Sequence, residues 1–359
     1  MTPKERILAV LSRQPVDRLP VDLWHTPEVA ADLRRHFRVA DDFAMWRALG
    51  LDKIVWDFME YRTDGGERAG GQSGAGAESS GSRTMWGVPL REIQAGEAHY
   101  AEFGAAPMAG FKTLASVEQY AWWPSVDRFD YDAAVSLAQR ASPEFAVIGP
   151  WVSCFEIYCQ LRGLEQAMTD LIEEPNLVEG ILDRVEAIQT GMMKRLFARA
   201  EGHLDLVFIS DDIAGQQSLL MSPHMWQAHL QPRLRRWCDL IHAHGLRVFY
   251  HTDGAARALI RPILDCGVDV LNPIQHACAG MDMAELKQEF GSRVIFHGGV
   301  DNQSVLPRGT AADVRAETRR CLETLGAGRQ GFICCSCHNV QPGTPLENII
   351  AMVETVHQS

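Results

Sequence analysis

Three residues, His251, Asp253 and His338, have the types and placement of metal ligands. His251 and Asp253 stand two residues apart where a strand-like run ends, and alternate residues of an extended strand point to one face. His338 follows the last such run. Two imidazoles and a carboxylate, with a fourth position open, are a ligand set of catalytic zinc sites. The sequence therefore predicts zinc here, with Gly254 letting the chain turn away. The alternative is a helix-capping Asp253 beside a buried, hydrogen-bonded His251.

Further ionisable and amide side chains follow other strand-like runs. The candidates for catalysis are Asp57, Glu156 and Asp212, and the candidates for binding a substrate are Asp211, Asn272 and Gln275. For Asp211 and Asp212, capping of the next helix is an equally good interpretation. The chain has no P-loop, no G-x-S-x-G and no G-x-G-x-x-G after a strand, so nucleotide and triad chemistry are unsupported.

The nine cysteines do not form a recognisable metal or redox motif. Cys334, Cys335 and Cys337 lie close together, but their spacing is not C-x-x-C and no second cluster completes a four-cysteine set. Cys334 and Cys335 are expected in the core, whereas Cys337 flanks His338 and is a further candidate ligand. An odd number of scattered cysteines without an export signal indicates reduced thiols in a cytoplasmic protein.

The alternation of buried strand-like runs with amphipathic helical patterns predicts a parallel sheet. The strand-like runs are Lys53–Phe58, Phe145–Gly149, Leu204–Ser210, Leu246–His251, Val268–Asn272, Arg293–His297 and Gly331–Cys335. An eighth strand is expected near Trp86–Arg91 or in the loop after His297. We therefore expect one α/β domain over residues 1–359, a single (β/α)₈ TIM-like barrel. In such barrels the loops after the strands share one mouth, which would bring the candidate residues together.

Two helix-capping patterns and one segment rich in Gly and Ser stand out in the rest of the sequence. Thr2-Pro3-Lys4-Glu5 and Thr344-Pro345-Leu346-Glu347 both have the pattern of a capping box with proline at the first helical position. Residues 64–82 are rich in Gly and Ser and are expected to form a flexible surface loop, with a substrate-gating lid as the alternative.

Composition excludes several classes of partner. The chain has 46% hydrophobic and 22% charged residues and a formal net charge of −12, with no long basic run. Such a chain repels a phosphate backbone or an anionic membrane surface, so nucleic-acid binding is not expected. No window reaches the about 18 apolar residues of a membrane span, and a protein without membrane association is expected.

The sequence resembles the uroporphyrinogen decarboxylase superfamily, which also contains cobalamin-linked methyltransferases. The resemblance covers nearly the whole chain. The motifs that carry it are TPKERILAVL, PVDRLPV, WGVPLR, the Gly149-Pro150-Trp151 turn, SDDIAGQQSLLMSP, FYHTDG, GVDVLNPIQ, FHGGVDNQSVLPRGT and CHNVQPGTPLENIIAMVE. The resemblance implies a (β/α)₈ barrel, in agreement with the strand pattern. Members often form dimers, so a homodimer is one expectation.

The methyltransferase-like branch is nearer than the true decarboxylases. The decarboxylases carry an arginine-rich motif where this chain reads VDLWHTPEVAADL, and Glu156 replaces their tyrosine after the Pro-Trp turn, although His338 matches their C-terminal histidine. In the methyltransferases that activate thiols, a His-x-Cys pair and a later Cys hold zinc. His251, Asp253 and His338 occupy those positions here. These harder ligands favour an oxygen-containing substrate over a thiol.

The resemblance thus implies a metal-dependent methyltransferase, or demethylase, that takes a methyl group from a small O- or N-methylated compound, such as a methoxylated one. The chain has no D-x-H-x-x-G cobalamin motif, so a separate corrinoid protein is the expected methyl acceptor. The first alternative is a metal-assisted decarboxylase or lyase acting on a small carboxylate. The second is a non-catalytic binding protein on a barrel scaffold.

Overall fold

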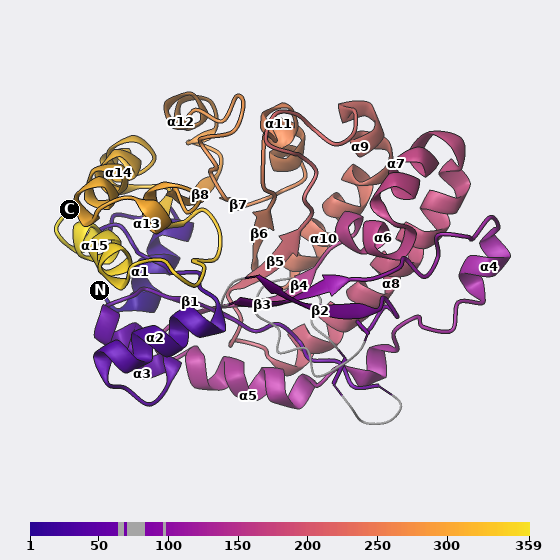
Figure 1. Cartoon of the computed structure of the whole chain (residues 1–359), viewed down its shortest axis with the longest axis horizontal. Coiled ribbons are helices and arrows are strands. Elements are labelled where there is room, and N and C mark those ends of the chain that lie inside the picture. The colour runs from indigo at the N-terminus through magenta and orange to yellow at the C-terminus, as the bar shows by residue number, and fades with distance from the viewer. Residues whose placement is uncertain (64–67, 70–82, 96–97) are drawn as a thin grey trace.

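A computed structural model describes residues 1–63, 68–69, 83–95 and 98–359 (Figure 1). Apart from residues 68 and 69, the Gly- and Ser-rich segment 64–82 lies outside the described residues. Within the described ranges, no helix has both the length and the apolar character needed to span a membrane.

Seven parallel strands form a curved sheet in the order β1-β4-β5-β6-β7-β8-β9. Their bounds are β1 (Ile54–Trp56), β4 (Ala146–Val152), β5 (Leu206–Ser210), β6 (Arg247–His251), β7 (Val270–Asn272), β8 (Ile295–Val300) and β9 (Phe332–Ser336). Each overlaps one of the seven runs predicted from the sequence, and β4, β8 and β9 extend beyond the predicted ends. The strands are buried almost throughout, because helices cover the sheet from outside and side chains fill its interior.

The eighth position in the ring belongs to the N-terminal segment around Val21. Val21 forms a parallel bridge with Cys334 of β9, and the Asp22 N–H donates to the Cys334 carbonyl at 2.8 Å. On the other side, the Asp52 N–H, just before β1, donates to the Val21 carbonyl at 2.8 Å. This segment therefore lies between β9 and β1 and closes the barrel.

The expected location of the eighth strand was wrong. The stretch near Trp86–Arg91 leads into an antiparallel hairpin of β2 (Leu90–Ala95) and β3 (Ala98–Phe103), and β8 itself continues past His297. The segment around Val21 escaped notice because it is short, contains a proline and carries a charged residue, so it lacks the continuous apolar run of its neighbours. The (β/α)₈ fold class is nevertheless confirmed.

Helices surround the strands on the outside (Figure 1). They are α1 (Pro3–Leu11), α2 (Pro27–Phe37), α3 (Asp42–Leu49), α4 (Leu114–Glu118), α5 (Tyr131–Ala141), α6 (Phe155–Arg162), α7 (Leu164–Glu173), α8 (Pro175–Arg199), α9 (Pro223–His229), α10 (Gln231–Ala243), α11 (Arg257–Asp265), α12 (Met283–Phe290), α13 (Val305–Arg308), α14 (Ala311–Thr324) and α15 (Leu346–His357), with 3₁₀ turns η1 (Val126–Arg128) and η2 (Ala327–Arg329).

One of the two predicted capping boxes forms. Thr2 accepts from the Glu5 N–H, and the Glu5 carboxylate accepts from the Thr2 N–H, so α1 has the complete motif. The second prediction was wrong, because α15 begins at Leu346 and its N-cap is Pro345, which makes no side-chain capping bond.

A buried ionic cluster ties the first segment to β1. The carboxylate of Asp52 is fully buried and receives hydrogen bonds from Arg6, from Arg18 at 2.6 Å and from the Val21 N–H at 2.9 Å. These donors replace the water that the charge loses on burial. The cluster supplements the single backbone bond between Asp52 and Val21.

We predict that Asp52→Asn destabilises the protein by about 3–5 kcal/mol, because it leaves two guanidinium groups without their shared buried charge. Urea unfolding followed by circular dichroism measures the effect. The control is Asp32→Asn, which removes an exposed ion pair with Arg35 and should cost less than about 1 kcal/mol. Equal effects of the two changes would contradict a stabilising role for the cluster.

Candidate metal and substrate site

His251, Asp253 and His338 converge at the mouth of the barrel. His251 ends β6, Asp253 follows it by two residues, and His338 lies just beyond β9. One potential ligand atom from each of the three lies within 4.8 Å of the others. The two imidazole rings are 5.7 Å apart between centroids. The geometry required for a shared ion is therefore present.

The turn after β6 holds Asp253 in place. The Asp253 N–H donates to Asp212 Oδ1 at 2.8 Å, and the Gly254 N–H donates to Gln275 Oε1 at 2.8 Å. Gly254 has a φ of +89°, and a Cβ there would lie 2.6 Å from the Gly215 carbonyl oxygen. Only glycine fits this conformation without strain, which agrees with its predicted role in the turn.

The histidine donors are poised to bind a cation. His251 Nδ1 is 2.6 Å from Asn272 Oδ1, whereas its Nε2 has Asp212 Oδ1 at 3.9 Å, beyond hydrogen-bonding distance. Neither ring nitrogen of His338 is hydrogen-bonded to a residue that the structure describes. Burial, reinforced by the neighbouring His251, lowers the pKa of His338, although Asp253 and Asp212 oppose the shift. Two imidazole nitrogens and one carboxylate fit a zinc ion with an open position.

Trp24 is a residue of the site that the sequence did not reveal. Its ring lies 5.7 Å from that of His251, 5.3 Å from that of His297 and 6.4 Å from that of His338, measured between centroids. It therefore forms an apolar platform beneath the histidines. No local pattern marks Trp24, because the segment around Val21 that carries it lacks the apolar run of the other strands.

An acidic group flanks the metal candidates. Glu156, near the start of α6, accepts a hydrogen bond from the hydroxyl of Ser210 at the end of β5. Burial raises the pKa of Glu156 well above its usual value, and the negative charges of Asp212 and Asp211 raise it further. Glu156 therefore retains its proton to a higher pH than a free glutamic acid does.

Asp211 positions Glu156. Its Oδ1 accepts from Ser153 Oγ at 2.7 Å and from the N–H groups of Phe155 at 2.6 Å and Glu156 at 3.2 Å. These bonds satisfy orphan donors at the start of α6, a helix that precedes Asp211 in the chain. Burial raises the pKa of Asp211 to about 6, against the opposing effect of these bonds.

Asp57 directly follows β1 and is buried with one unpaired oxygen. Within the described ranges, its Oδ2 has no hydrogen-bond partner, and burial raises its pKa to about 7. Its backbone packs tightly on β4, because a Cβ on Gly149 would lie 2.3 Å from the Asp57 carbonyl oxygen. Within the part of the chain that the structure describes, no hydrogen bond or ion pair joins Asp57 to the convergent histidines.

The remaining candidates make contacts within the protein. The amide of Asn272 is hydrogen-bonded to both His251 and His297, and that of Gln275 holds the Gly254 N–H. Cys337 is buried, its thiol donates to the Ile274 carbonyl at 3.4 Å, and it is not among the three convergent residues.

Comparison with known proteins identifies the family. A family model described as uroporphyrinogen decarboxylase matches residues 107–359, well over half of the chain. The chain belongs to the uroporphyrinogen decarboxylase family. This match spans β4 to β9 and therefore contains all three convergent residues.

Relatives within the family carry two kinds of name. Over 223 residues the chain is 26% identical to a methylcobamide:CoM methyltransferase, MtaA, of Methanosarcina barkeri, covering 62% of this chain and 61% of that protein. It is 27% identical over 175 residues to a uroporphyrinogen decarboxylase of Thermus thermophilus, covering 48% of this chain and 47% of the relative. The chain thus matches between about half and three fifths of the length of these relatives.

A solved structure shares the fold along the whole chain. It is a methyltransferase from Methanosarcina mazei, with a TM-score of 0.70 and 18% identity, and the match covers 100% of this chain and 99% of that one. This likeness confirms the barrel fold expected for the family.

We predict that His338→Ala lowers the affinity for zinc by more than about 100-fold, because losing one of three protein ligands exceeds the effect of losing an outer-shell contact. Titration against a competing chelator measures the affinity. Cys337→Ala is the matched control and should leave it unchanged. A similar loss in both variants would place the ion elsewhere.

A second prediction concerns Asp57 and stability. The pKa of Asp57 is raised from 3.8 to about 7 in the folded protein, so between these values the unfolded chain loses the proton first and stability falls as pH rises. Each unit of pKa difference corresponds to about 1.4 kcal/mol. Asp57→Asn stays neutral at every pH, so it does not lose this stability as pH rises. The melting temperature of the variant minus that of the wild type should therefore increase from acidic to mildly alkaline pH. Parallel curves for the two proteins, as expected for the exposed control Asp32→Asn, would contradict this.

Proposed function

We propose that this protein is a metal-dependent methyltransferase that demethylates a small O- or N-methylated substrate and passes the methyl group to a separate corrinoid protein. The observation that carries the proposal is the convergence of His251, Asp253 and His338 beside a protonatable Glu156. The similarity to MtaA, a methylcobamide:CoM methyltransferase, supports the reaction class.

His251, Asp253 and His338 would hold the metal. A zinc ion bound there would supply Lewis acidity toward the substrate's oxygen or nitrogen. The ligand set contains no thiolate, and Cys337 points to the Ile274 carbonyl. Nitrogen and oxygen ligands leave such an ion harder than thiolates do, which favours a methylated oxygen or nitrogen over a thiol.

Glu156 would supply the proton that the leaving group needs. When the methyl group leaves as a cation equivalent to a cobalt(I) nucleophile, the electron pair of the broken C–O or C–N bond stays on the substrate. The protonated carboxyl of Glu156 then gives its proton to that atom, and an alcohol or amine is released. Ser210 orients the carboxyl through its hydroxyl, and Asp211 fixes the backbone that carries it.

The other candidates take supporting parts in this proposal. Asp212 lies between the two halves of the site, since its carboxylate accepts from the Asp253 N–H and its charge raises the pKa of Glu156. Asp57 provides a second protonatable carboxyl after β1. Asn272 and Gln275 hold His251 and the Gly254 turn, so we assign them to the scaffold of the site.

The decisive experiment supplies zinc-loaded protein with cob(I)alamin and a panel of methoxylated and N-methylated compounds. Formation of methylcobalamin, followed by its absorption spectrum, is the expected result. Release of carbon dioxide from small carboxylates without corrinoid would instead establish a decarboxylase. Zinc-free protein that binds members of the panel without turnover would establish a binding protein.

We predict that Glu156→Gln lowers kcat by at least about 100-fold, the lower end of the contribution of general acid catalysis. The wild-type rate should fall as pH rises through the raised pKa of Glu156, and the variant should lack this dependence. The melting temperature should change little, because glutamine still accepts from Ser210. The control is Glu165→Gln at an exposed position of α7. A large loss of stability would show that Glu156 is a structural residue.

A further inference from the structure

A continuous chain of buried side chains runs from β1 to the candidate metal ligand His251. Lys53 Nζ lies 2.9 Å from Asp22 Oδ1, and Asp22 Oδ2 lies 3.2 Å from His297 Nε2. His297 Nδ1 is 2.8 Å from Asn272 Nδ2, and Asn272 Oδ1 is 2.6 Å from His251 Nδ1. All five side chains are buried, so water does not interrupt the chain.

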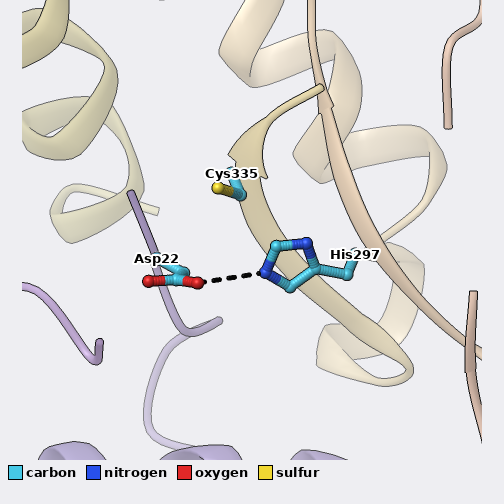
Figure 2. A group of neighbouring side chains, drawn as sticks. All are labelled: Asp22, His297 and Cys335. Carbon is cyan, nitrogen blue, oxygen red and sulfur yellow. Dashed lines mark hydrogen bonds and ion pairs between the residues drawn. The ribbon is translucent and has the colours of Figure 1, made fainter. Parts of the chain in front are cut away.

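Part of this chain has the composition of a second metal site. Asp22, His297 and Cys335 offer ligand atoms within 4.8 Å of one another. Figure 2 shows the Asp22 carboxylate directed at the His297 ring, with the Cys335 thiol beside the pair and not bonded to it.

The contacts of Asp22 argue against a cation there. Oδ1 already accepts from the ammonium of Lys53, and Oδ2 accepts from Trp24 Nε1 at 3.1 Å as well as from His297. An ion would have to displace these donors and stand beside a positive charge. The thiol of Cys335 is also kept protonated, since burial raises its pKa well above the usual value. This group is therefore a hydrogen-bonded network.

The carboxylate of Asp22, next to Lys53 at one end, fixes which atom donates in each later hydrogen bond of the chain. Burial alone would raise the pKa of Asp22, but Lys53 and His297 lower it overall, so Asp22 is an acceptor only. His297 must then carry its hydrogen on Nε2. Burial lowers the pKa of His297, which leaves the ring neutral and its Nδ1 an acceptor.

The protonation of His297 also fixes how the Asn272 amide is oriented. An acceptor at His297 Nδ1 requires the amide nitrogen of Asn272 to face it, and the same nitrogen lies 3.4 Å from the His297 carbonyl oxygen. The amide oxygen therefore faces His251, whose Nδ1 must be the donor. Gly298 makes room for this amide, because a Cβ there would lie 3.3 Å from Asn272 Nδ2.

We propose that the Lys53–Asp22–His297–Asn272 chain is a positioning device that holds His251 as its Nδ1–H tautomer and directs the lone pair of Nε2 toward the metal. The role toward metal rests on the proposed function, whereas the tautomer is a property of the chain itself. Histidine ligands commonly donate their second ring N–H to an outer partner, and losing such a partner weakens metal binding by about 10–100-fold.

Nitrogen-15 NMR of histidine-labelled, metal-free protein tests the chain directly. The expected result is opposite tautomers in the two rings, Nδ1–H in His251 and Nε2–H in His297. The opposite assignment in either ring would overturn the proposal. Because no metal is present, this result is independent of the proposed function.

Variants of Asn272 test the effect on metal. Asn272→Leu should weaken zinc binding about 10–100-fold in a chelator competition. Asn272→Asp keeps the acceptor for His251 but places a second acceptor against His297. It should therefore retain the Nδ1–H of His251 and convert His297 to the doubly protonated ring, a distinct NMR signature. If Asn272→Leu does not fold, the NMR spectrum of Asn272→Asp still tests whether Asn272 accepts from His251 and donates to His297.

The matched control is Asn348→Leu. Asn348 is a buried asparagine of α15 whose amide donates to the Leu306 and Gly309 carbonyls, away from the chain. The Asn348→Leu variant should have a lower melting temperature than the wild type but the same zinc affinity. Equal zinc affinity in wild type and Asn272→Leu would overturn the positioning role. Absence of zinc binding by the wild type would overturn the proposed function while leaving the tautomer result to stand.

Discussion

The parallel pairing of Val21 with Cys334 joins the N-terminal segment to the last strand and closes the ring of strands. Without this pairing, β9 would be an open edge of the sheet, joined to β6 and His251 only through β7 and β8. The same pairing inserts Asp22 and Trp24 into the interior beneath the mouth. The aromatic platform and the hydrogen-bonded chain both follow from it.

The other side of that segment is held mainly by charge. Only one backbone bond joins it to the stretch before β1, but two buried carboxylates cross the same boundary. Asp22 on the segment pairs with Lys53, and Asp52 pairs with Arg6 and Arg18. A buried charge without its partner costs several kcal/mol, a large part of the net stability of a typical domain, so a shifted register is strongly penalised. Ion pairs thus specify an alignment that the short strands alone would leave loose.

Much of the fold was predictable, because seven strands coincide with continuous apolar runs in the sequence. The eighth was not, since the segment around Val21 owes its strand conformation to β9 and to the buried ion pairs, which no local pattern reveals. The same distinction applies to the site. His251 and Asp253 were found from a local spacing, and His338 from the shared mouth of the barrel.

The contacts of the supporting residues were beyond such reasoning. Asp22, Lys53 and His297 come from separate segments, and their contacts exist only after the barrel closes. Asn272 was correctly placed at a strand end, but its burial between two histidines depends on the register of β7 against its neighbours. Spacing in a sequence thus finds residues on one strand, whereas outer-shell partners require the packing itself.

The closed barrel divides the mouth into two electrostatic halves. On one half, burial without nearby cations raises the pKa values of Glu156, Asp211 and Asp57, so these carboxyls retain protons that a free acid would lose. On the other half, burial lowers the pKa of His338, so this ring keeps its lone pair unprotonated down to a lower pH than a free imidazole does. Desolvation favours the neutral form on both sides, yet it creates a proton donor from an acid and a metal ligand from a base. A single physical effect therefore prepares both groups that the proposed demethylation would use.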